Sequence, residues 1–167
     1  MQSHTDPGRV ESKLVLYGLL AGILSGVVQF IATIITISNL NSMLTPFPQV
    51  KSVFSSSSSW IIKVVIGISP LLAIIQCAFY GAIFGVIANV LVGAGLKAPI
   101  AAFISGVLYF IAFSVVPISA LLITGITNET LLALMFAHPL TYLILFTMFS
   151  TLKGPWSKVF EGGPKRY

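Results

Sequence analysis

The stretch that decides the fold runs from Leu14 to Ser38 and reads LVLYGLLAGILSGVVQFIATIITIS. It carries no charged residue, and it is longer than the roughly 20 apolar residues with which an α-helix crosses the hydrocarbon core of a bilayer. A cleavable signal peptide has a shorter apolar region followed by a small-residue cleavage site, and no A-x-A pattern follows here. We therefore expect a retained transmembrane helix over residues 14–38.

The whole chain of 167 residues shares this apolar character. It is 56% hydrophobic and 8% charged, with a mean hydropathy of +1.01, whereas a soluble domain carries about a quarter charged residues. In water, such a chain would expose much of its apolar surface and aggregate. The composition predicts an all-α integral membrane protein in contact with the lipid bilayer, and its length leaves room for one helical bundle.

The apolar stretch from Trp60 to Gly93 is too long for one ordinary span. As a helix rising 1.5 Å per residue it would measure roughly 50 Å, against about 30 Å of hydrocarbon. Proline is favoured in the first turn of a helix, so Pro70 offers a division. We expect a short interfacial helix at 60–68 and a span at 70–93; a re-entrant pair over the same stretch is the alternative.

Apolar stretches of helix length alternate with short polar stretches along the rest of the chain, and this alternation predicts the remaining spans and loops. Together they predict a polytopic bundle of four transmembrane helices. The expected organisation is a cytoplasmic tail at 1–13, a single transmembrane domain at 14–152, an extracytoplasmic loop at 39–59, third and fourth spans at 98–124 and 131–152, and a cytoplasmic tail at 153–167.

The basic residues predict the orientation of the chain. Lys and Arg number nine against four acids, which gives a net charge of +5. With both termini in the cytoplasm, only Lys51 and Lys63 fall in outer segments, as the positive-inside rule favours. The other basic residues form no run and no patch interleaved with aromatic residues, so we expect no nucleic-acid partner. The inner basic residues are Arg9, Lys13, Lys97, Lys153, Lys158, Lys165 and Arg166.

The first and third spans share a sequence pattern. Residues 21–32 read AGILSGVVQFIA and residues 101–112 read AAFISGVLYFIA. Duplication of a helical hairpin would explain this pattern, and parallel repeats of this kind occur in several transporter folds. The alternative is chance, because apolar helices use a small set of residue types, and the second and fourth spans share only a Pro-Leu pair. A real duplication would make the bundle two tandem helical hairpins.

Small residues recur on one face of several spans. Such faces let neighbouring helices approach closely, so we interpret them as helix-packing surfaces. In the first span the same face continues through Gln29, Thr33 and Thr36, for which the functional interpretation is a polar path through the bundle. The helix-packing candidates are Gly18, Gly22, Gly26, Gly81, Gly85 and Gly106.

Four polar side chains are expected at similar depth in the spans: Gln29, Gln76, Ser114 and His138. We refer to them as the polar layer, and it is the candidate functional site. Polar groups inside a membrane are costly unless they are satisfied by other protein groups. For His138 we expect a neutral ring bonded to a neighbouring carbonyl or hydroxyl. Gln76 lies roughly opposite the glycine face of its own helix, so convergence of all four is not required.

The sequence offers no catalytic, cofactor or metal site. All four acids lie outside the expected spans, Cys77 is the single cysteine, and His4 and His138 are the two histidines. A thiol redox pair, a bis-histidine haem site and a His/carboxylate metal site all need more ligands than these. Phosphate-binding and metalloprotease motifs are absent as well. We expect no enzyme and no cofactor.

Two functional classes remain. The first, which the small-residue faces favour, is a small membrane subunit or scaffold that acts through helix packing. The second is an oligomeric channel or carrier for a neutral or weakly polar small solute, favoured by the repeated pattern, the polar layer and two prolines inside spans. Four helices rarely enclose a pore, so the second class requires a homo-oligomer, whereas the first requires a homo-oligomer or a larger membrane complex.

Overall fold

The computed structural model describes residues 7–39, 45, 49, 52, 60–123 and 129–151. Within these residues the elements are helices, and four helical stretches are long and apolar enough to cross a membrane. The predicted all-α bundle with four spans is thus confirmed, and the protein is a multi-pass membrane protein. These spans are Lys13–Ser38, Val64–Gly93, Ala98–Ser119 and Leu132–Thr151.

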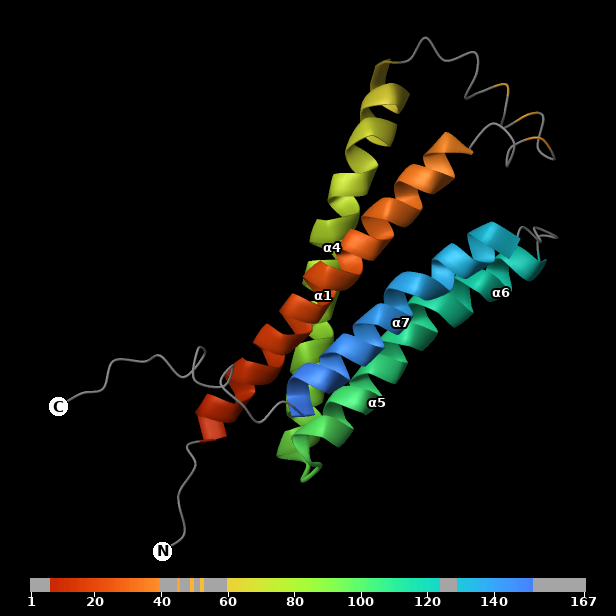
Figure 1. The fold of residues 1–167 in the computed structure, drawn as a ribbon. Helices are drawn as coiled ribbons and strands as arrows, with labels where there is room; N and C mark the ends of the chain where they lie inside the picture. The colour runs from red at the N-terminus through yellow and green to blue at the C-terminus, as the bar shows by residue number, and fades with distance from the viewer. Residues whose placement is uncertain are drawn as a thin grey trace, which may run out of the picture.

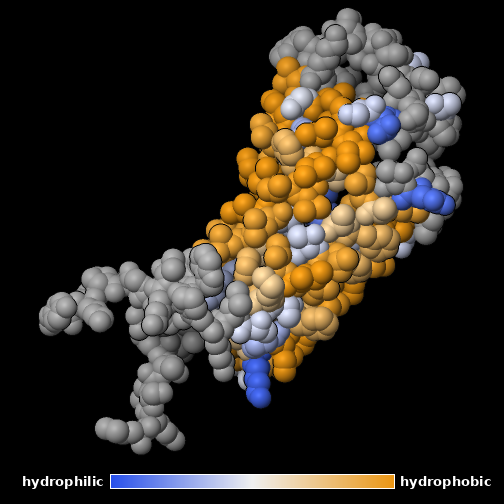
Figure 2. All heavy atoms as spheres, viewed as in Figure 1, coloured by the Kyte–Doolittle hydropathy of each residue, from blue (hydrophilic) through white to orange (hydrophobic). Residues whose placement is uncertain are grey.

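The helices form two pairs, which we name the first and second hairpins. Helices α1 and α4 cross closely, and the segment α5–η1–α6 runs beside α7 as the second hairpin (Figure 1). Apolar residues cover the visible surface between the two ends of the described helices, near which the most hydrophilic residues lie (Figure 2). The elements are α1 (Pro7–Ser38), α4 (Trp60–Gly93), α5 (Ala98–Phe110), the π-helix η1 (Ile111–Val115), α6 (Val116–Ile123) and α7 (Glu129–Thr151).

Helix α4 is continuous, which corrects the expected division at Pro70. The residues expected to form a separate interfacial helix at 60–68 are the first turns of α4, and no re-entrant break occurs. Proline has no amide hydrogen, so the carbonyl of Ile66 loses its helical donor. The hydroxyl of Ser69 donates to that carbonyl at 2.9 Å instead. The expected loop and both tails lie largely outside the described residues.

Glycines bring α1 and α4 into backbone contact. A Cβ atom on Gly22 would lie 3.0 Å from the Cα of Ala78, and one on Gly81 would lie 2.9 Å from the Cα of Gly22. No side chain fits at these distances, because the opposing atoms are backbone. Gly18, Gly26 and Gly85 lie in the same contact, while Gly106 packs against Leu143 of α7. The small-residue faces are therefore occupied inside the chain.

A tight turn joins the two hairpins at Gly95, whose φ is +97°. The amide of Leu96 donates to the carbonyl of Leu91 at 3.1 Å, and that of Gly95 donates to Val92 at 2.9 Å. These two bonds form the Schellman motif that ends many helices, and its left-handed residue is usually glycine. Pro99 then lies in the first turn of α5, where its missing amide hydrogen costs no helical bond.

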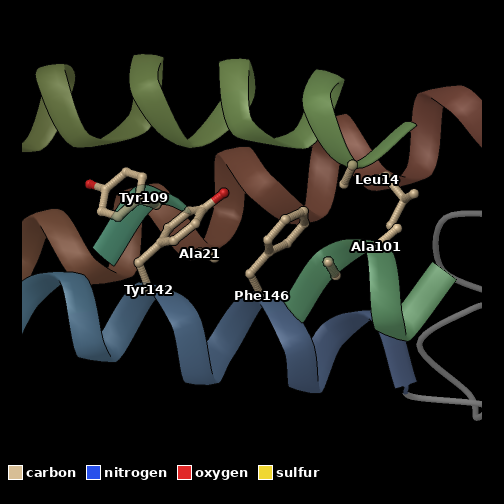
Figure 3. Close-up of a cluster of buried hydrophobic side chains, with 8 residues drawn as sticks. Leu14, Ala21, Ala101, Tyr109, Tyr142 and Phe146 are labelled. Atoms are coloured by element: carbon tan, nitrogen blue, oxygen red, sulfur yellow. The ribbon is translucent and has the colours of Figure 1, made fainter. Parts of the chain in front are cut away.

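Buried aromatic side chains fill the contact between the hairpins (Figure 3). Tyr109 of α5 stacks on Tyr142 of α7 with ring centroids 4.0 Å apart. The hydroxyl of Tyr142 donates to the carbonyl of Gly81 at 3.1 Å, and the hydroxyl of Ser105 donates to that of Phe84. Two hydrogen bonds thus tie the second hairpin to α4. Leu14, Ala21, Ala88, Ala101, Ala102 and Phe146 complete this core.

The glycine contact generates a stability prediction. Replacing Gly81 with alanine forces α1 and α4 apart, and we expect the free energy of unfolding to fall by about 1–3 kcal/mol. Gly67→Ala is the matched control, because a Cβ atom there meets nothing within 4 Å. Alanine has the higher helix propensity, so the control should leave stability unchanged or raise it by up to about 1 kcal/mol. Denaturation in detergent followed by circular dichroism measures both, and equal effects would contradict the contact.

Candidate functional site

A cavity of about 450 Å³ lies between the C-terminal half of α1 and the second hairpin. Its size is within the range of pockets that bind small molecules. Its polar walls are Gln29, Thr33 and Thr36 of α1 and His138 of α7. The apolar lining residues are Ala32, Ile37, Phe113, Pro117, Leu134 and Met135.

The α1 wall presents hydrogen-bond acceptors. Gln29, Thr33 and Thr36 share one helix face because their spacings of four and three residues match the helical repeat. The hydroxyl of Thr33 donates to the carbonyl of Gln29 at 2.8 Å, and that of Thr36 donates to Ala32 at 2.9 Å. Each hydroxyl hydrogen is thereby used, while the oxygen can still accept a hydrogen bond. The Gln29 amide offers both a donor and an acceptor.

The opposite wall contains two turns in which proline disturbs the helix. Pro117 has no amide hydrogen, and the preceding turn is the π-helix η1, where Val116 donates to Ile111. Single π-helical turns occur frequently at functional sites. In α7, Pro139 likewise deprives the carbonyl of Met135 of its helical donor. Ser114 of η1 donates to that carbonyl at a long 3.4 Å and thus connects the two disturbed turns.

His138 faces this cavity with an unsatisfied ring nitrogen. The side chain is 7% exposed, and Nδ1 has no hydrogen-bond partner among the residues that the structure describes. The rings of Tyr109 and Phe113 contact the imidazole edge to face, at centroid distances of 6.4 and 6.5 Å. We expected a carbonyl or hydroxyl partner for the ring, and Nδ1 has none within the described residues. A buried polar atom without a partner raises the free energy, so a bound molecule that pairs with it would be stabilised.

The structure does not bring the four residues of the polar layer together. Gln29 and His138 line the cavity, and Ser114 lies buried behind the wall, bonded to Met135. Gln76 is exposed on the outer face of α4. The reason is helical geometry: at about 100° per residue, Gln76 lies about 140° around the helix from Gly81, which faces α1. Gln29 and His138 thus share the cavity, whereas Ser114 and Gln76 of the polar layer do not line it.

Some of the site was visible in the sequence and some was not. Thr33 and Thr36, interpreted as part of a polar path with Gln29, line the cavity as that interpretation requires. The roles of Phe113 and Tyr109 beside His138 were missed. Pro117 indicated in the sequence that the helix is disturbed near this position. The sequence did not indicate that this turn would lie opposite α1.

The described residues were also compared with the pattern of a metal site. No group of three or more His, Cys, Asp or Glu side chains that could hold a metal ion occurs among them. Comparisons of the chain with models of known protein families, with curated proteins and with solved structures find no match. The cavity is therefore interpreted from its own geometry and chemistry.

Cysteine labelling tests whether water reaches the cavity. In a Cys77→Ala background, we expect Thr33→Cys to react with a membrane-impermeant thiol reagent much faster than Ile34→Cys. The reactive thiolate forms in water and not in lipid, and the unpaired polar atoms of the cavity favour water there. Ile34 is the matched control because it is adjacent and more exposed, at 43%, but lies outside the cavity lining. Faster labelling of the Ile34 variant would contradict a hydrated cavity.

Proposed function

We propose that this membrane protein binds an uncharged, partly apolar small molecule in the cavity between its hairpins and carries it within or across the bilayer. The observation that supports this proposal is the unpartnered Nδ1 of His138, buried in a cavity that also presents Gln29. Protein interiors rarely leave such an atom unsatisfied. A ligand with a hydroxyl or amide group supplies the missing hydrogen bond.

The lining favours a neutral ligand over an ion. Among the described residues that line the cavity there is no Lys, Arg, Asp or Glu, so a charged ligand would be buried there without a counter-charge, which is strongly unfavourable. The imidazole, amide and hydroxyl groups pair with neutral donors and acceptors, while Phe113 and Leu134 accommodate an apolar body. The proposal is of a binding protein and not of an enzyme, since His138 has no acid or cysteine beside it in the lining.

The position of the cavity between two helical hairpins supports a carrier. Secondary transporters hold their substrates at the interface between structural repeats that move against each other. Here the cavity lies between the two hairpins, which pack α1 on α7 and α4 on α5. If α1 is exchanged with α5 and α4 with α7, the α1–α7 contact becomes the α5–α4 contact, and the reverse also holds. A duplicated hairpin would produce this symmetry. Relative motion of the hairpins would open and close the cavity.

A membrane subunit that acts through helix packing is the second candidate. The glycine faces that suggested it are occupied within the chain, so association with other chains needs a different surface. The outer face of α4, on which Gln76 is exposed, is a candidate for this second contact surface. The two candidates are compatible, because an oligomeric carrier uses both the cavity and an outer contact.

We also propose that both termini are cytoplasmic, with the α4–α5 turn on the same side. The ends of the described helices support this, because the start of α1 and the α4–α5 turn lie at one end of the bundle (Figure 1). In intact cells, Lys97→Cys should resist an impermeant thiol reagent and should react after permeabilisation. Immediate labelling in intact cells would reverse the orientation.

A ligand-binding experiment tests the proposed function. We expect a medium-chain primary alcohol or amide to raise the thermal unfolding midpoint of the detergent-solubilised protein, because a ligand that binds only the folded state stabilises it by mass action. The carboxylate and ammonium compounds of equal chain length should not raise it, since the described residues of the lining offer no counter-charge.

Two variants locate the binding and a third serves as control. Gln29→Leu and His138→Leu each remove one hydrogen-bonding group, so the affinity for the alcohol should fall about two- to tenfold. Gln76→Leu makes the same chemical change as Gln29→Leu, but outside the cavity, and should bind normally. Equal loss in all three variants, or equal stabilisation by the charged compounds, would refute the proposal.

A further inference from the structure

Gln76 is a polar side chain on a surface that should otherwise face lipid. It lies in the span Val64–Gly93, of which about 20 residues cross the hydrocarbon. Every 20-residue window of that span contains Gln76, so Gln76 lies in the hydrocarbon whichever window crosses it. Its side chain is exposed, and its amide makes no hydrogen bond to the described part of the chain. Other exposed polar side chains in the described spans behave differently: the hydroxyl of Ser119 donates to Val115 of its own helix at 2.7 Å. In lipid, an unpaired amide is costly.

The residues around Gln76 form a regular seam along α4. Leu72, Gln76, Phe79, Ile83, Val86 and Val90 follow one another at alternating spacings of four and three residues. All six are exposed, and the five apolar members range from 38% at Ile83 to 67% at Val90. This spacing is the heptad pattern of a two-helix contact, in which Gln76, Ile83 and Val90 take one of the two core positions. The seam spans an arc of about 80° on the side of α4 that faces away from α1.

We propose that this seam is the contact between two copies of the chain, related by a two-fold axis along the membrane normal. Copies inserted in the same orientation bring their α4 helices together in parallel, and in a parallel heptad contact each core residue meets its own counterpart. Gln76 therefore lies opposite Gln76 of the second copy. A primary amide both donates and accepts, so two of them satisfy each other reciprocally.

A second copy fits this seam better than an unrelated partner. The single polar residue in the seam is self-complementary, and a polar residue at one core position of a heptad contact fixes register and oligomeric state. Ile83 and Val90 occupy the same core position of the heptad as Gln76, and both are β-branched. β-Branched residues at one core position are typical of two-stranded parallel coiled coils. The contact to α1 lies on the other side of α4, so dimerisation leaves the hairpin and the cavity intact.

Cross-linking in the native membrane tests the position of the contact. A photo-reactive benzophenone side chain introduced in place of Phe79 or Ile83 should form covalent dimers on irradiation, because this reaction needs no thiolate. The controls carry the same group in place of Phe103 on α5 and Ile144 on α7, which are exposed to 51% and 55% but lie outside the seam. Cross-linking confined to the seam supports the proposal. Equal cross-linking at the controls, or seam adducts to a different protein, would overturn it.

Association in lipid vesicles tests the role of the amide. Dilution of fluorescently labelled protein with lipid, followed by energy transfer, gives the dimerisation constant. Gln76→Leu should weaken it about tenfold, as expected for one polar pair across a helix contact in a membrane, whereas Gln76→Asn should retain part of the association. Gln29→Leu and Ser119→Ala should leave it unchanged. An unchanged constant for Gln76→Leu would overturn the proposal without affecting the ligand-binding experiment.

Discussion

The hydrocarbon core of a bilayer holds no water, so every polar group inside it must find a partner within the protein, at a cost of several kcal/mol if it does not. The bundle follows this constraint closely. Where Pro70 and Pro139 leave the carbonyls of Ile66 and Met135 without helical donors, the hydroxyls of Ser69 and Ser114 take their place. The hydroxyl of Tyr142 reaches the carbonyl of Gly81 on another helix. Among the described residues, the buried Nδ1 of His138 and the buried hydroxyls of Tyr109 and Thr147 have no hydrogen-bond partner, and neither has the exposed amide of Gln76. Of these side chains, His138 and Gln76 carry the two proposals.

These two residues lead to different conclusions because they lie on different surfaces. His138 is buried beside a cavity of about 450 Å³ and points to a ligand that enters the protein. Gln76 is exposed on an apolar helix face and points to a protein surface that covers it. The cavity and the outer seam lie on different surfaces, so the two proposals are compatible. Together they would describe a dimer whose protomers each hold a site between two hairpins.

Much of the architecture could be predicted from the sequence, because hydrophobic length alone identifies spans. The glycines of α1 were recognisable as a close-packing face, and the face that continues through Gln29, Thr33 and Thr36 was recognisable as polar. The separate helix at 60–68 was wrong, because proline terminates helices in water more readily than in a membrane, where Ser69 replaces the missing donor. The position of Gln76 away from the glycine face of α4 was recognisable from the helical repeat, and the structure places its side chain on the outer face of that helix.

The sequence by itself determined the solvent, the number of spans and the residues that allow close backbone contact, since these depend on composition and on spacing along one helix. The tertiary structure alone decided which helices meet. It placed α1 across α4 at Gly22 and Gly81, and it brought the disturbed turn at Pro117 opposite the polar face of α1. Contacts between helices depend on crossing angle and rotation, which arise from the packing of whole surfaces. For that reason the cavity appears only in three dimensions.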